Sequence, residues 1–158
     1  MTEIADPEPV LPSLLPWQTD RWEELVARRR SGRFPHALLL SGPQGIGKRQ
    51  FAHRVAAALV CDATDPAAAP CGSCRSCRLV RSGTHPDIRW LTPEAEGKAI
   101  RVDAVRSLID QSSLTTQAQG MRVFIVEPAD AMNAAAANAL LKTLEEPPAS
   151  SCLLLVSS

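Results

Sequence analysis

The stretch Gly42-Pro43-Gln44-Gly45-Ile46-Gly47-Lys48-Arg49 decides the fold, because its first seven residues meet the pattern G-x-x-x-x-G-K-[ST]. It lies between an apolar run at 37–40, which predicts a strand, and an apolar stripe at 51–59 with helical spacing. Glycines there let backbone N–H groups converge on phosphate oxygens, and Lys48 can reach the terminal phosphates. The sequence therefore predicts a phosphate-binding loop, with a chance glycine-rich turn as the alternative.

Two features that an active ATPase needs are altered, at three positions. Arg49 stands where a hydroxyl would bind Mg²⁺, and a guanidinium, which has only donors, repels a cation. After the apolar run at 123–126, Glu127 replaces the metal-binding Asp and Pro128 replaces the acid that orients the attacking water. We therefore expect a nucleotide-binding fold retained without hydrolysis. The alternative is a working ATPase or nucleotide kinase with an unusual metal site.

Apolar runs alternate with helical stripes along the chain, which predicts an α/β fold with a parallel sheet sandwiched by helices. Strands are expected at 37–40, 88–91, 123–126 and 153–156, and helices at 20–30, at 51–59, after a cap at Asp103, and at about 133–144. The strand at 37–40 is expected to be buried on both faces. Residues 1–16, with four prolines, predict an irregular lead-in before a domain at 17–158.

Four of the five cysteines lie close together in the sequence, at Cys61, Cys71, Cys74 and Cys77. In the reduced cytoplasm this spacing indicates metal binding before disulfides. Four thiolates suit a structural, tetrahedral Zn²⁺, and an iron–sulfur cluster is the main alternative. Because residues 61–77 are rich in Ala, Pro and Gly, we expect a loop without a core of its own, in a zinc insert at 61–83.

The remaining cysteine and the histidines receive no catalytic or metal role. Cys152, inside the last predicted strand, is expected to be an unligated buried thiol. His36, His53 and His85 are scattered and are expected to be turn or surface residues.

Composition narrows the class of protein. A length of 158 residues argues for one domain, and 45% apolar residues, 22% charged residues and zero net charge are typical of soluble proteins. The apolar runs are far shorter than the ~18–20 residues that cross a bilayer, and the N-terminus lacks a secretory signal. We therefore expect a cytoplasmic protein with no membrane partner. Residues 21–60 hold eight Lys and Arg against two acids, which indicates either a polyanion-binding surface or a solvated helix face.

The longest motif is Asn138-Ala139-Leu140-Leu141-Lys142-Thr143-Leu144-Glu145-Glu146-Pro147-Pro148. Together with Phe34-Pro35-His36-Ala37, the cysteine insert and Gly83-Thr84-His85-Pro86-Asp87, it resembles the bacterial clamp-loader subunits of DNA polymerase III over about residues 17–158. Those subunits are AAA+ ATPases, so the resemblance implies an AAA+ nucleotide-binding fold. A gamma/tau motor branch keeps the Mg²⁺ and acidic positions, and a stator branch has lost them. The altered positions place this chain in the stator branch.

The resemblance implies a largely non-hydrolysing subunit of the polymerase holoenzyme that helps to load the sliding clamp onto primed DNA. Its partners would be the gamma/tau and delta subunits, and an active ATPase of the gamma/tau type is the alternative. Because Lys48 and the loop glycines are kept, ATP binding stays open. The family's Ser-Arg-Cys motif, lid and collar would follow Ser158, so we expect a truncated, N-terminal AAA+ domain.

Two surface features carry further hypotheses. Asn138, Lys142, Glu145 and Glu146 match the family segment that couples DNA, neighbouring subunit and nucleotide, with an exposed, charged helix end as the alternative. A zinc-ribbon nucleic-acid binder that uses arginines of the insert on phosphates ranks last, because the insert has few aromatic residues to stack on bases. Those arginines are Arg75, Arg78 and Arg81.

Overall fold

The computed structural model describes residue 11 and residues 13–112, 121–148 and 150–158. The helices are α1 (Thr19–Arg30), α2 (Lys48–Val60), α3 (Arg75–Arg81), α4 (Val102–Ser112) and α5 (Ala134–Glu145), and the strands are β1 (Ala37–Ser41), β2 (Ile88–Leu91), β3 (Arg122–Val126) and β4 (Ser151–Ser157). Short 3₁₀ turns lie at Pro16–Gln18, Pro66–Ala68 and Ala129–Ala131. Most of the expected lead-in, residues 1–10 and 12, lies outside the described residues.

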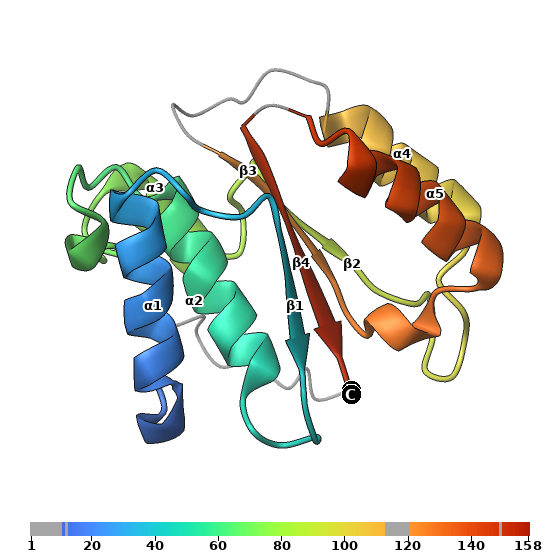
Figure 1. The fold of residues 1–158 in the computed structure, drawn as a ribbon, viewed down its shortest axis with the longest axis horizontal. Coiled ribbons are helices and arrows are strands. Elements are labelled where there is room, and N and C mark those ends of the chain that lie inside the picture. Colours follow the sequence, from blue (N-terminus) through green and yellow to red (C-terminus); the bar gives the residue numbers. More distant parts are fainter. Residues whose placement is uncertain (1–10, 12, 113–120, 149) are drawn as a thin grey trace, which may run out of the picture.

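The four strands form one parallel sheet in the order β1-β4-β3-β2. Helices α1, α2 and α3 lie on one side of this sheet, and α4 and α5 lie on the other (Figure 1). This arrangement confirms the expected α/β fold, with a parallel sheet between two helical layers. It also brings the carboxyl ends of β1, β3 and β4 to the same edge as the loop at 42–47.

The core on the α2 side is made by the predicted helical stripe. Phe51, Val55 and Leu59 are buried in a cluster that includes Ile125 of β3 and Leu154 of β4. A second cluster packs α4 and α5 onto the opposite face of the sheet. Each residue of β3 is buried, which suits its place inside the sheet.

Strand β1 differs from the expectation that it would be buried on both faces. Leu38 and Leu40 pack on the α2 side, but Leu39 is 64% exposed. The strand is an edge strand that pairs with β4 in the described sheet. An apolar run shows that a strand can be buried, but it does not show whether another element covers its second face.

The start of α4 also differs slightly from the prediction. The helix begins at Val102, so Asp103 lies in its first turn and is not the cap. A carboxylate in that turn still favours the helix, because the N-terminal end carries a partial positive charge.

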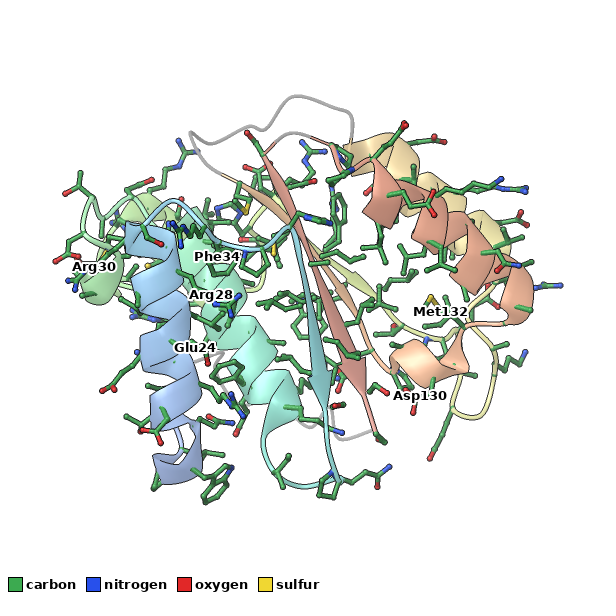
Figure 2. The ribbon with its side chains drawn as sticks, viewed as in Figure 1. Glu24, Arg28, Arg30, Phe34, Asp130 and Met132 are labelled. Atoms are coloured by element: carbon green, nitrogen blue, oxygen red, sulfur yellow. The ribbon has the colours of Figure 1, made fainter. Side chains whose placement is uncertain are left out.

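The insert is more ordered than the sequence indicated. Helix α3 begins within it, Cys77 and Val80 are buried, and Val80 belongs to the main core cluster. Arg30 of α1 forms an ion pair with Asp65 at 3.0 Å, which joins the insert to the helical layer (Figure 2). The expectation of a loop up to residue 77 was therefore wrong at its end, where α3 begins at Arg75, because the apolar spacing from Cys77 to Val80 covers less than one helical turn and is too short to indicate a helix.

The described part of the chain contains no helix with the length and apolar character needed to cross a membrane.

Candidate functional site

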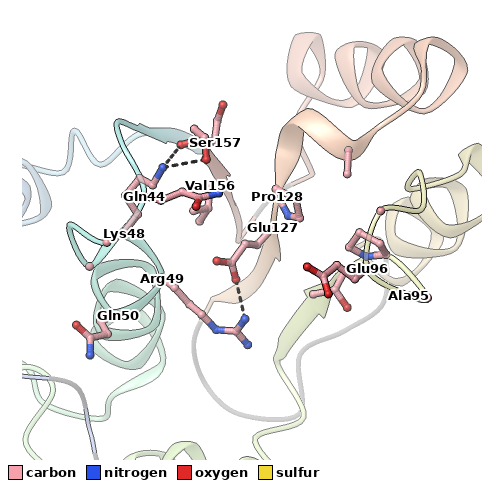
Figure 3. A pocket seen from close by; sticks show the side chains of 17 residues that line it. Gln44, Lys48, Arg49, Gln50, Ala95, Glu96, Glu127, Pro128, Val156 and Ser157 are labelled. Atoms are coloured by element: carbon pink, nitrogen blue, oxygen red, sulfur yellow. Dashed lines mark hydrogen bonds and ion pairs between the residues drawn. The ribbon is translucent and has the colours of Figure 1, made fainter.

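The loop at 42–49 lies where the sequence predicted it, between β1 and α2. It borders an open cleft of about 730 Å³ that is also lined by residues 92–97, by Glu127 and Pro128 after β3, and by the end of β4 (Figure 3). Gly47 is the N-cap of α2 with φ +83°, and a Cβ at this position would lie 2.5 Å from Leu15 Cδ1. The positive φ favours glycine here, and a larger side chain would also have to displace Leu15.

Lys48, the predicted phosphate-contacting residue, points into this cleft. Its ammonium donates to the carbonyl oxygen of Ser157 at the end of β4 (Figure 3) and to that of Gly42, directly after β1. Since both carbonyls carry partial negative charge, they hold the ammonium beside the loop. A phosphate would have to compete with these two acceptors for Lys48.

Arg49, the residue after Lys48 on α2, forms an ion pair with Glu127, with Arg49 NH1 3.0 Å from Glu127 Oε2 (Figure 3). The guanidinium carbon of Arg49 also lies 4.8 Å from the centre of the Trp90 ring. The two altered positions of the sequence motif thus contact each other directly. The side chain that replaces the metal-binding hydroxyl is a cation, and it already pairs with the nearest acid.

His53, one helical turn after Arg49, belongs to the same cluster. Its ring packs edge-on against Trp90 with centroids 6.0 Å apart. Burial, and to a smaller extent the charge of Arg49, lower the pKa of His53. The imidazole is therefore mostly neutral near pH 7.

Trp17 and Gln18 contact the loop although the sequence analysis gave them no role. Trp17 Nε1 donates to the carbonyl of Ile46 at 2.9 Å, and Gln18 Nε2 donates to the carbonyl of Gly47 at 3.0 Å. These partners are 28 or 29 positions away in the sequence. No local pattern carries a signal for such contacts.

The four cysteines of the insert converge as their spacing predicted. Their sulfur atoms all lie within 4.8 Å of one another, with Cys71 and Cys77 3.9 Å apart and Cys74 and Cys61 4.0 Å apart. Four sulfurs bound to one zinc ion at ~2.3 Å would lie about 3.8 Å apart, so the spacing fits a single tetrahedral ion. Among the described residues, this is the only group of three or more side chains that could hold a metal.

Backbone N–H groups surround the sulfurs in a manner that suits thiolates. Cys71 N donates to Cys61 Sγ, Cys74 N to Cys71 Sγ and Cys77 N to Cys74 Sγ, each at 3.3 Å. Hydrogen bonds led by the N–H of Ser73 lower the pKa of Cys71 to about 6, whereas burial raises the pKa values of Cys61 and Cys77. A bound cation would favour the thiolate at all four positions. The donor set therefore fits a metal ion.

The other residues to which the sequence analysis gave a role or an expectation lie outside both the cleft and the cysteine cluster. Asn138, Lys142, Glu145 and Glu146 are exposed on and just after α5, and none of them lines the cleft. Cys152 is buried in β4, which raises its pKa to about 12. His85 begins the expected turn before β2, since its carbonyl accepts from the N–H of Ile88 at 3.4 Å, but its side chain is buried and accepts a hydrogen bond from the N–H of Asp87 at 3.0 Å.

Comparison with known proteins identifies the family. The family described as "DNA polymerase III, delta subunit" matches residues 17–158. The chain belongs to this family. It is 49% identical to DNA polymerase III subunit delta' of Pseudomonas aeruginosa over 144 residues, and 39% identical to subunit delta' of Escherichia coli over 142 residues. These matches support the delta' branch over the gamma/tau alternative.

The chain spans less than half of these relatives. The matched stretches cover 91% and 90% of this chain but only 43% and 42% of the two delta' subunits. A DNA polymerase III gamma subunit-related protein from Thermotoga maritima has a similar structure, with a TM-score of 0.55 over 87% of this chain and 39% of that chain. At 22% identity, this similarity supports the fold alone.

Proposed function

We propose that this chain is the N-terminal AAA+ domain of a clamp-loader subunit of the delta' type. In this role it is a stator that does not hydrolyse ATP and that helps to load the sliding clamp onto primed DNA. The observation that carries the proposal is the ion pair between Arg49 and Glu127 in a retained phosphate-loop fold. A domain that hydrolyses ATP would not carry the cationic Arg49 at the position that binds Mg²⁺. A domain with a structural role needs only to keep the fold.

The charged side chains in the cleft support the proposal that it does not bind Mg²⁺ for ATP hydrolysis. Arg49 and Glu127 neutralise each other at 3.0 Å, so Glu127 is not free to ligate Mg²⁺. Pro128, which lines the cleft beside Glu127, has no side-chain group that could orient a water. These are the two tasks that ATP hydrolysis requires in this fold.

The partners proposed for the full-length protein are the gamma/tau and delta subunits, with the sliding clamp and primed DNA reached through the complex. The domain is residues 17–158 with its insert at 61–83, and the lid and collar would follow it in the full-length protein. The exposed residues Asn138, Lys142, Glu145 and Glu146 would couple it to its neighbours. A replication role places the protein in the cytoplasm.

Size-exclusion chromatography tests the proposed assembly. This chain and its full-length parent would each be mixed with purified gamma/tau and delta subunits. We expect the full-length protein to enter a stoichiometric complex and this chain to elute alone, because an interdomain surface of modest area binds weakly. Failure of the full-length protein to join the complex would overturn the proposal.

For the cysteine cluster we propose one structural Zn²⁺ per chain, held by Cys61, Cys71, Cys74 and Cys77. Four thiolates close the coordination shell, so the ion would stabilise the insert and leave no position open for a substrate. Elemental analysis of protein purified without added metal should give zinc at about one ion per chain. Iron with sulfide, or no metal, would refute this assignment.

A further inference from the structure

The 3₁₀ turn at Pro16–Gln18 is connected to the phosphate loop by its side chains. Gln18 is only 7% exposed, and both ends of its amide are used. Its Oε1 accepts from the N–H of Leu15 at 3.1 Å, while its Nε2 donates to the carbonyls of Gly47 at 3.0 Å and Ile46 at 3.4 Å. Trp17 adds its indole N–H to the carbonyl of Ile46 at 2.9 Å.

These bonds constrain two peptide groups in the loop, and the Gly47 carbonyl also accepts the first hydrogen bond of α2 from the N–H of Phe51 at 2.9 Å. In a trans peptide unit the C=O and the following N–H point in opposite directions. Holding the carbonyls of Ile46 and Gly47 toward the turn therefore directs the N–H groups of Gly47 and Lys48 away from it. Gly47 and Lys48 line the cleft, and Trp17 and Gln18 line a groove beside α1 and β1 that Ile46 and Lys48 also border. In a phosphate-binding loop, the N–H groups on the side away from the turn are the ones available to an anion.

The packing around Gly47 supports this arrangement. A Cβ at Gly47 would lie 2.5 Å from Leu15 Cδ1 and 3.0 Å from Gln18 Nε2. The turn therefore packs closely against the loop at Gly47. A buried amide that loses its partners is costly, which gives the contact a persistent geometry.

We propose that Trp17 and Gln18 are positioning residues for the phosphate loop. They hold its peptide groups in the anion-binding orientation without a bound ligand, so the loop is pre-organised by a segment that precedes α1. This role goes beyond the proposed function and does not depend on it, because it applies whether or not the domain hydrolyses ATP.

Backbone ¹⁵N relaxation of the chain tests the proposal. Trp17→Phe removes the indole N–H but keeps an aromatic ring, and Trp17 is 62% exposed, so this variant should fold. Gln18→Met keeps the length of the side chain and removes the amide. We expect order parameters at Gly45, Gly47 and Lys48 to fall from about 0.85 to below about 0.6 in the double variant, and by a smaller amount in Trp17→Phe.

A matched control separates positioning from general destabilisation. Trp22→Phe alters another tryptophan, whose ring packs edge-on against Phe51 at 6.2 Å, and no hydrogen bond from Trp22 to the loop is found in the described structure. This variant should leave the loop order parameters unchanged, and the amides of β3 should stay rigid in every variant. Unchanged loop order in the double variant, or in Trp17→Phe if the double variant does not fold, would overturn the proposal. An equal loss of order in β3 would also overturn it.

Discussion

At the scale of single residues, the buried ion pair between Asp87 and Arg122 is a determinant of stability. Asp87 Oδ1 lies 3.5 Å from Arg122 NH2, and the two side chains are 1% and 9% exposed. Arg122 also donates to the carbonyl of Gln111 at 2.5 Å, which joins the start of β3 to α4. Removing the charge of Asp87 takes an anionic partner away from a buried guanidinium, which costs more than the pair itself contributes.

We expect Asp87→Asn to lower the free energy of unfolding by about 3–5 kcal/mol. Urea denaturation measures this loss, and Glu24→Gln is the matched control. Glu24 pairs with Arg21 and Arg28 on the exposed face of α1 at 3.4 and 3.2 Å, so its loss should cost about 1 kcal/mol or less (Figure 2). Equal losses in the two variants would contradict this account.

The histidines give the fold a pH dependence. Burial lowers the pKa of His85, and burial with the charge of Arg49 lowers that of His53. Both contributions favour the fold above the ordinary value of about 6.5, and they are lost as the pH falls through the folded-state pKa values, because the unfolded chain then binds more protons. Stability should therefore decrease from pH 6.5 downward. An NMR titration of the imidazoles should place both pKa values below 6.5, and a higher value for either would refute the assignment.

At the scale of elements, local sequence patterns correctly predicted the features that depend on neighbouring residues, such as the extent of α5 and the buried face of α2. Helix α5 was expected at about 133–144, and Asn133 caps it by accepting a hydrogen bond from the N–H of Ala136 at 2.9 Å. The stripe on α2 predicted its buried face in the same way. By contrast, the exposure of Leu39, the order of α3 and the hydrogen bonds of Gln18 depend on elements far away in the sequence. The same distinction holds for the candidate site. Lys48 and the four cysteines were predicted because they belong to local motifs, whereas Trp17 was missed because its contact with the loop is distant in the sequence.

Helix α3 connects the cysteine cluster to the core and allows a clean test of the metal. Cys74 caps α3, with its sulfur accepting from the N–H of Cys77 at 3.3 Å. Serine is a good helix cap, so Cys74→Ser keeps the cap and removes one thiolate. We expect the variant to lose its metal, with faster hydrogen exchange over residues 61–81 and unchanged protection in β3. The reason is that the metal offsets the ordering entropy of the insert.

Cys152→Ala is the control for this experiment, because its thiol is buried in β4 and does not belong to the cluster. It should retain one metal ion per chain, measured by elemental analysis after dialysis. Full metal retention in Cys74→Ser, or metal loss in Cys152→Ala, would exclude the four-cysteine site.

At the scale of the whole molecule, the cleft combines a phosphate loop that keeps its glycines and Lys48 with charged side chains that are paired within the protein. Lys48 is held by two carbonyls and Arg49 by Glu127. If the cleft binds ATP, the affinity should depend on Lys48 and only weakly on Mg²⁺, because no hydroxyl at position 49 can ligate the ion. Titration with labelled ATP should therefore give a Kd that changes less than about tenfold on removal of Mg²⁺. A strict Mg²⁺ requirement would show that the cleft assembles a metal site despite Arg49.

The central claim is that the domain keeps the phosphate-loop fold without its chemistry, and ATP turnover tests it most directly. Release of labelled phosphate would be measured with excess purified protein and Mg²⁺, beside a Lys48→Ala variant prepared identically to reveal contaminating ATPases. We predict the same background rate for both proteins, because Arg49 and Pro128 occupy the two positions that hydrolysis requires. Phosphate release above background that Lys48→Ala abolishes would contradict the account.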